Sequence, residues 1–186
     1  MKAHDASVNP LQANAHDPYV DHPPARPAAH PPYGPIQPAA PSMSNPFDMQ
    51  SACPSQMRVQ RAGEGIAPAP SGVSSGPFLV QMLLSSRTDG EMTAMRIFAP
   101  PGVVTHWHSH PRGQLLFVID GVGYAQRDGG QRVEIRAGDC VWFAPGERHW
   151  HGAAPSSPFS YISIQPVLGD SAVDWMEPLN SGDRLP

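Results

Sequence analysis

The sequence predicts an all-β protein in which one barrel or sandwich follows a long proline-rich tail. Many short runs of strand-forming residues are separated by glycine and proline turns, which is typical of such folds. No segment has the sustained periodicity of an amphipathic helix. Proline content also falls along the chain, because 14 of the 24 prolines lie before residue 77. A chain of 186 residues with this division favours a single folded domain.

The expected tail covers residues 1–76. Its apolar residues show no period of about 2 or 3.6, so it cannot bury enough surface to offset the entropy of ordering. We expect it to be disordered, with polyproline II character between Pro23 and Pro41. The composition also suits a docking tail for a proline-recognising partner. A plain spacer, or a reading frame that begins too far upstream, is the favoured interpretation, because composition alone is weak evidence.

The expected strands follow one another within residues 77–167. Turn signals such as Thr88-Asp89-Gly90 and Asp128-Gly129-Gly130 separate them. We expect a C-terminal extension over residues 168–186, with one further edge strand near residues 173–179. The strand candidates are residues 78–85, 92–99, 106–110, 114–119, 124–127, 133–137, 140–144, 149–151 and 159–167.

Charge and hydropathy exclude several classes of protein. The formal charge is −4 and no basic cluster favours nucleic acid. The longest aliphatic or aromatic run, Leu115 to Ile119, is too short to span a bilayer, and the first residues lack the apolar part of a secretory signal. We therefore expect a cytoplasmic protein without a membrane or nucleic-acid partner. Two cysteines, Cys53 and Cys140, do not make a disulfide framework, and we expect two unpaired thiols.

Three histidines at alternate positions, His106, His108 and His110, indicate a metal site. Alternate side chains of a strand point to the same face, so these three rings would share one face. A bend at residues 111–113 leads to Gln114, which opens the next strand. Two strands joined by a bend would bring His108, His110 and Gln114 toward one point. Imidazole nitrogens with an amide oxygen suit a divalent transition metal, with Mn, Fe, Co, Ni and Zn all possible.

The same stretch resembles the first motif of the cupin family. That motif places glycine, His-x-His, glutamate and a second glycine at fixed intervals. Gly102, the pair His108 and His110, and Gly121 stand at the matching positions. Gln114 stands where the motif has glutamate.

A second histidine cluster resembles the second cupin motif. Gly138, Gly146 and His149 occupy matching positions. Ala144 stands in place of the motif's proline, and Ala153 in place of an asparagine that the family keeps only loosely. Together the two clusters would supply three nitrogens and one oxygen to a metal. One or two positions would stay open for water or substrate, as in catalytic sites.

The resemblance implies a cupin double-stranded β-helix, a jelly-roll barrel. The strings HWHSHPRGQLLFV and RHWHGA are most similar to small single-domain, RmlC-like bacterial cupins that include manganese-dependent hydroxynitrile lyases. This resemblance implies that manganese is the first metal to consider and that His151 has a catalytic role. The implied metal ligands are His108, His110, Gln114 and His149.

His106 and His151 are the two candidates for acid–base chemistry. By alternation His106 would share a face with His108, and His151 with His149. Each would line the cavity as a general base or acid, since histidine titrates near neutral pH. The alternative for each is a hydrogen-bonded packing residue.

Three functional classes follow for a small-molecule substrate. The first is a lyase of the hydroxynitrile lyase type that uses the metal as a Lewis acid and a histidine as base. The second is an Fe(II)-dependent oxygenase, and the third a non-enzymatic ligand-binding or sensor cupin.

The run Leu115 to Ile119 is apolar on both faces, so one face needs cover outside the barrel. Because small cupins commonly pair, we expect a homodimer.

Overall fold

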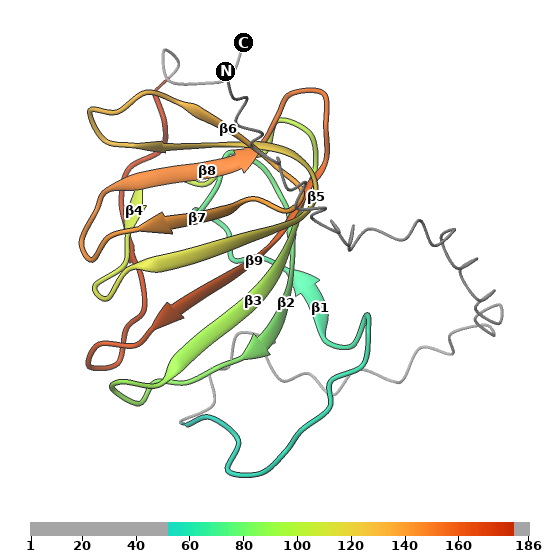
Figure 1. Ribbon diagram of the computed structural model, residues 1–186, viewed down its shortest axis with the longest axis vertical. Coiled ribbons are helices and arrows are strands. Elements are labelled where there is room, and N and C mark those ends of the chain that lie inside the picture. The colour runs from blue at the N-terminus through green and yellow to red at the C-terminus, as the bar shows by residue number, and fades with distance from the viewer. Residues whose placement is uncertain (1–51, 181–186) are drawn as a thin grey trace, which may run out of the picture. The chain divides into compact units, whose positions relative to one another are not determined.

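The computed structural model describes residues 52–180, which form ten β-strands and no helix (Figure 1). No helix in this part of the chain could cross a membrane. Both cysteines are free thiols. The strands are β1 (Ile66–Pro68), β2 (Leu79–Leu84), β3 (Met92–Ala99), β4 (His108–Ser109), β5 (Gln114–Arg127), β6 (Val133–Arg136), β7 (Cys140–Phe143), β8 (His149–Ala153), β9 (Phe159–Pro166) and β10 (Asp174–Trp175).

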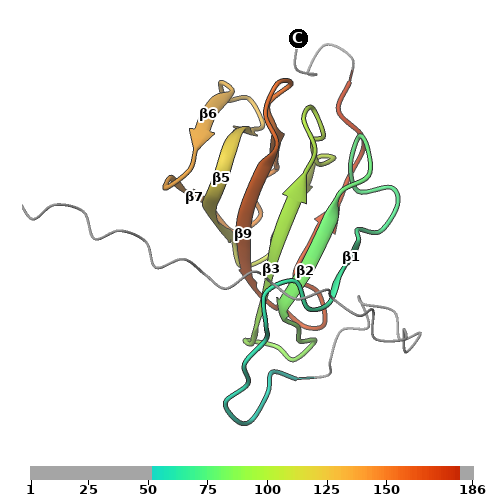
Figure 2. The same cartoon turned by 90° about the vertical axis from the view of Figure 1, so that its right-hand side faces the viewer.

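All strand pairs are antiparallel, and the sheet order is β1-β2-β3-β9-β5-β8-β4-β10. Figure 2 shows β5, β9, β3, β2 and β1 side by side. The long strand β5 joins two halves of the sheet. Its first half pairs with β7 and β9, and its second half pairs with β6 and β8. The sheet therefore curls around one interior, as the jelly-roll prediction requires.

The course of β5 differs in one respect from the sequence prediction. We expected separate strands over residues 114–119 and 124–127, whereas β5 continues through Gly121-Val122-Gly123 between them. Its pairing with β9 shifts register between Val118 and Asp120. Such an irregularity bends a strand locally and increases its twist. This bend lets one strand serve both halves of the curled sheet.

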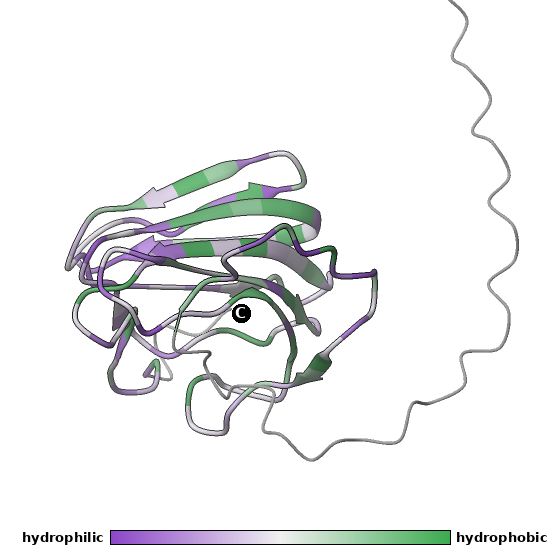
Figure 3. Ribbon diagram, turned by 90° about the horizontal axis from the view of Figure 1, so that it is seen from below, coloured by the Kyte–Doolittle hydropathy of each residue, from purple (hydrophilic) through white to green (hydrophobic). Residues whose placement is uncertain are grey.

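The interior lies between the inward faces of the strands. In β9 every second residue is buried, beginning at Phe159 and Tyr161. Leu116 and Val118 of β5 pack against them from the neighbouring strand. Hydrophobic stretches accordingly run along the strands, interrupted by hydrophilic residues (Figure 3). Burial of this apolar surface is the main stabilising contribution to such a core.

The segment before residue 77 differs from the expectation of a wholly disordered tail. β1 pairs with the edge of β2, and Val73 is buried. The side chain of Gln81 donates a hydrogen bond of 2.9 Å from Nε2 to the carbonyl oxygen of Glu64. Only three residues form β1, and proline occupies its last position, so the sequence carries no strand pattern there. Residues 1–51 of the expected tail lie outside the described part of the chain.

The C-terminal extension adds β10 to the sheet. Trp175 pairs with His108, and Asp174 pairs with Ser109 of β4. The amide of Met176 donates to the carbonyl oxygen of Trp107 over 2.9 Å, which prolongs this contact. The extension therefore lies beside the histidine strand. Residues 181–186 are not among those described.

Candidate metal centre and cavity

Three histidines from two strands meet inside the barrel. His108 of β4 pairs directly with His149 of β8, and His110 follows two residues after His108. One ring nitrogen from each lies within 4.8 Å of the others. All three residues are at most 2 % exposed. This separation leaves room for one ion bound by all three rings.

The backbone orients each of these rings in the same way. Nδ1 of His108 donates to the carbonyl oxygen of His106 over 2.9 Å. Nδ1 of His149 donates to Glu147 over 2.7 Å, and Nδ1 of His110 donates to Ala172 over 2.6 Å. A carbonyl oxygen only accepts, so the proton of each neutral ring lies on Nδ1. The lone pair then lies on Nε2, as metal-binding histidines require.

Gln114 completes the set from the first position of β5. Its Oε1 lies 3.1 Å from Nε2 of His149. Its amide nitrogen donates to Oγ of Ser163 over 2.8 Å, and Ser163 donates to Oε1 of Gln165 over 2.8 Å. Gln114 therefore turns its oxygen toward His149, whose Nε2 also carries a lone pair. Two facing acceptors are unfavourable unless a cation lies between them, so these residues fit a metal ion.

The electrostatics of the cluster favour neutral rings. Burial lowers the pKa of His149 to about 3 and that of His110 to about 4. Burial also lowers the pKa of His108 well below its usual range, and the neighbouring histidines lower it further. Charged imidazole is costly in such an environment. The three Nε2 atoms are thus unprotonated near neutral pH and can act as ligands.

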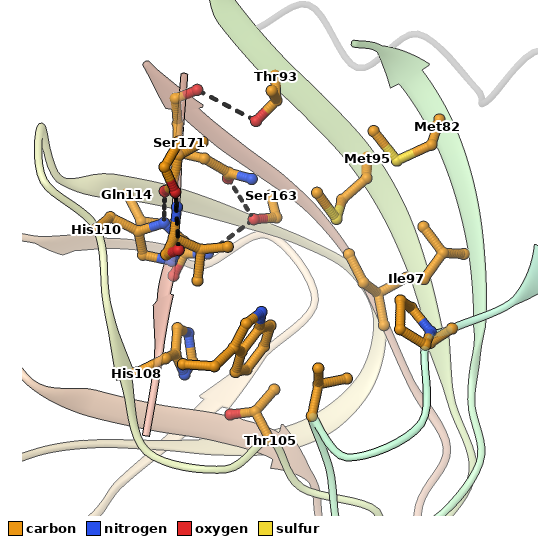
Figure 4. A pocket seen from close by; sticks show the side chains of 18 of the residues that line it. Met82, Thr93, Met95, Ile97, Thr105, His108, His110, Gln114, Ser163 and Ser171 are labelled. Atoms are coloured by element: carbon orange, nitrogen blue, oxygen red, sulfur yellow. Dashed lines mark hydrogen bonds between the residues drawn. The ribbon is translucent and has the colours of Figure 1, made fainter. Parts of the chain in front are cut away.

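A cavity of about 400 Å³ opens from this cluster into the barrel. His108, His110 and Gln114 line one end (Figure 4). The opposite wall is apolar, and in Figure 4 its labelled members project from the strands facing the histidines: Met82, Met95 and Ile97. Such a cavity, mostly apolar with a few convergent polar groups, is typical of small-molecule sites.

His151 lines the same cavity, and its ring makes no hydrogen bond to any described residue. It is 3 % exposed, and neither ring nitrogen is hydrogen-bonded in the described structure. Its ring centroid lies 5.1 Å from that of His108 and 5.9 Å from that of His149. Reciprocal hydrogen bonds of 3.1 Å between its backbone and Oγ1 of Thr105 hold its position. Burial lowers the pKa of His151, and His149 and His110 lower it further.

His106 does not join this group, contrary to the alternation argument. It is half-buried and is absent from the residues that line the cavity. Its carbonyl oxygen, rather than its ring, serves the site by accepting from His108. Strand β4 covers only His108 and Ser109, and the chain bends at Trp107. Alternation requires extended backbone, so it does not hold at His106, which lies before the bend at Trp107.

Several residues of the site were not singled out from the sequence. Ser163, Gln165 and Tyr161 face the cavity from β9, and burial raises the pKa of the Tyr161 hydroxyl. The predicted strand over residues 159–167 carried the signal, because these three residues alternate along it. Trp175 and Ala172 contribute from the extension. No residue pattern indicates Ala172, since it acts through its backbone carbonyl.

Comparison with known proteins gives results that agree with this geometry. The cupin domain model matches residues 95–165. A protein of Granulicella tundricola named (R)-mandelonitrile lyase is 41 % identical over 122 residues, which span 65 % of this chain and 93 % of that protein. Among solved structures, a cupin-like protein of Thermotoga maritima is 30 % identical, with a TM-score of 0.59 over 63 % of this chain and 89 % of that one.

A second structure from Thermotoga maritima, described as a predicted oxalate decarboxylase, has the same fold at 24 % identity. Its TM-score is 0.53, and the match covers 60 % of this chain and 100 % of that one. The motif positions, the curled antiparallel sheet and the extent of the mandelonitrile lyase match agree with one another. The chain belongs to the cupin family.

Proposed function

We propose that this protein is a metal-dependent lyase that cleaves or forms cyanohydrins. The observation that carries the proposal is the position of His151. This buried histidine has two unpartnered ring nitrogens and lines the same cavity as His108 and Gln114. The relative from Granulicella tundricola, named (R)-mandelonitrile lyase, supports the reaction type.

The metal would be held by Nε2 of His108, His110 and His149 and by Oε1 of Gln114. The unpartnered Nε2 of His110 and the facing acceptors of Gln114 and His149 support this ligand set. A bound divalent cation would act as a Lewis acid toward a substrate oxygen, more strongly because the amide of Gln114 cancels no charge. Manganese is the first metal to test, with Fe, Ni, Co and Zn as alternatives.

His151 would move the proton of the reaction. The rings of His108, His110 and His149 would be committed to the metal through Nε2, so His151 is the lining histidine left free to act as a base. Asp170 also lines the cavity but is exposed. The unprotonated ring nitrogen of His151 takes the hydroxyl proton of the cyanohydrin. The carbonyl forms as the carbon–carbon bond to cyanide breaks and its electron pair leaves with cyanide. In the reverse direction His151 returns the proton to the oxygen.

The cavity wall suits an apolar substituent on the substrate carbon. Met82, Met95 and Ile97 lie across the cavity from the histidines (Figure 4). Their side chains offer no strong hydrogen-bond donor or acceptor, whereas the histidine end offers several polar groups. A substrate with one polar end and one apolar end would therefore be oriented with its oxygen toward the metal ligands.

The test is turnover of mandelonitrile by protein stripped of metal and then reloaded with Mn, Fe, Ni, Co or Zn. We expect release of benzaldehyde and cyanide only from reloaded protein, with and without oxygen. Turnover of organic substrates that requires both iron and oxygen would favour the oxygenase. Saturable binding without turnover by any reloaded protein would favour the ligand-binding cupin. Either result would overturn the lyase.

We further propose that the protein is a homodimer that pairs through the outer face of the sheet. Leu115 of β5 pairs with Trp142 on one side and with Ile164 on the other, forming an apolar row across three strands. Phe117, two residues further along β5, is 45 % exposed, and Trp142 is 57 % exposed. Contiguous apolar surface of this kind is typical of interfaces. A second copy would cover it on both subunits at once.

A further inference from the structure

A chain of two hydrogen bonds connects Gln114 to residues that lie further from the metal centre. The Gln114 amide nitrogen donates to Oγ of Ser163 over 2.8 Å, and Ser163 donates to Oε1 of Gln165 over 2.8 Å. We infer that Ser163 and Gln165 are positioning residues, which hold Gln114 with its oxygen toward the metal and its nitrogen away. This inference rests on the metal site of the proposed function.

A glutamine ligand needs such positioning because its two ends differ. One end is an oxygen that can bind a metal, and the other is a nitrogen that can only donate. If the amide turned over, its N–H would point at the lone pair on Nε2 of His149, 3.1 Å from the present oxygen. That hydrogen bond would occupy Nε2 of His149, and this nitrogen could then no longer bind the metal. The turned amide is therefore the arrangement that the protein has to exclude.

Ser163 excludes it through the direction of its own hydrogen bond. Its single proton goes to Gln165, so its oxygen is left to accept from Gln114. A turned amide would place the oxygen of Gln114 against the oxygen of Ser163, with no proton between them. With Gln165 presenting its oxygen to Ser163, Ser163 donates to Gln165 and accepts from Gln114.

Burial of the three side chains protects the hydrogen bonds that orient Gln114. Gln114, Ser163 and Gln165 are each 3 % exposed, so water does not readily replace the bonds among them. The strands also place them well. Leu116 of β5 pairs with Ser163, and Gln114 lies two residues before Leu116 on the same inward face. Ser163 is then a diagonal neighbour of Gln114 across the strand pair.

The inference predicts an effect that is specific to glutamine at position 114. Glutamate has two equivalent oxygens when ionised and presents no N–H to His149. In a Gln114→Glu protein, the direction set by Ser163 should no longer matter. A merely structural role of Ser163 in the barrel would matter equally with either residue at position 114.

The experiment measures the dissociation constant of Mn²⁺ by competition with a fluorescent chelator. The proteins are the full-length chain, Ser163→Ala, Ser163→Thr and Gln165→Met, with Ser163→Ala also made in the Gln114→Glu background. Ser160→Ala is the matched control, because Ser160 lies on the same strand with its side chain bonded to Arg96 outside the site. Circular dichroism of the metal-free proteins establishes that each is folded.

We expect Ser163→Ala to weaken Mn²⁺ binding by about 10- to 100-fold and Ser163→Thr to restore most of it. Gln165→Met should weaken binding in the same direction, while Ser160→Ala leaves it unchanged. In the Gln114→Glu background, Ser163→Ala should change binding by less than about threefold. Equal losses in both backgrounds, or no loss in either, would overturn the inference alone. A wild-type protein that binds no metal would overturn the proposed function with it.

Discussion

The indole ring of Trp175 lies against the imidazole of His108, with the ring centroids 4.8 Å apart and the planes inclined by 38°. The contact joins the C-terminal extension to the candidate metal centre, since Trp175 belongs to β10 and pairs with His108. The carbonyl oxygen of Glu177 accepts from the amide of Trp107 over 3.2 Å, so the extension stays hydrogen-bonded two residues after Trp175. The extension therefore forms one wall of the site.

Replacing Trp175 by alanine should speed the loss of metal. Without the indole, water and small chelators reach His108 more easily, and the ring loses a contact that fixes its orientation. We expect a rate of metal loss to excess EDTA that is about 10-fold or more faster than in the wild type, as for other supporting contacts around metal ligands. Val133→Ala is the control, because Val133 is exposed on β6 and does not line the cavity. Equal rates for the two variants would contradict a role for the extension in holding the metal.

Replacing His108 and His110 together by alanine should empty the metal centre. The double variant removes two of three nitrogens that meet within 4.8 Å. Elemental analysis of purified protein should give about one divalent ion per wild-type chain and less than about 0.1 per variant chain. His106→Ala should retain the wild-type content, because its side chain does not line the cavity. Full retention in the double variant would place the metal elsewhere.

His151→Ala should lose turnover while it keeps the metal. If His151 is the base, its removal should lower kcat for cyanohydrin cleavage by roughly 10²-fold or more. His106→Ala is the comparison that separates the two candidate bases, and its kcat should stay near that of the wild type. Both proteins should hold wild-type metal. Near-native turnover by metal-loaded His151→Ala would remove the proposed role.

A charge on the outer face of the sheet should dissociate the proposed dimer. Phe117→Lys would bury an ammonium group against apolar side chains, which costs roughly 2 kcal/mol or more at the centre of an interface. Light scattering across a dilution series should show a dimer mass for the wild type and a monomer mass for the variant. Leu168→Lys, a charge at an exposed apolar residue outside the sheet, should stay dimeric. A wild-type mass of one chain at every concentration would refute the dimer.

The sequence was sufficient for much of the fold because local patterns and tertiary packing agree there. The stretch Met92–Ala99 is bounded by Gly90 and by Pro100, and the structure has β3 at the predicted residues. At Gly123 the local pattern misled the prediction, because glycine serves packing rather than a turn. A Cβ at Gly123 would lie 2.6 Å from the carbonyl oxygen of Gly152 and 2.7 Å from the ring of Phe159. Both neighbours come from later strands.

Some parts of the site could likewise be predicted from local sequence, whereas others depend on contacts between distant segments. His108, His110 and Gln114 lie within seven residues of one another, so a strand, a bend and a second strand were enough to predict their proximity. The place of His106 depended on where the strand begins, which sequence determines poorly. The carbonyl of Ala172 and the hydroxyl of Ser163 depend on strand pairing over long sequence separations. No local pattern specifies which backbone oxygen will face a given ring.

The bond between His110 and Ala172 also bears on when the protein can mature. Ala172 follows His110 by 62 residues, so at a synthesis rate of about 5–20 residues per second it is made roughly 3 to 12 s later. During that interval a nascent chain already carries His108, His110 and Gln114 but lacks the acceptor that orients His110. A fully oriented centre therefore becomes available only after the segment around Ala172 has left the ribosome. For the proposed metal site, loading would therefore come at the end of folding rather than at its beginning.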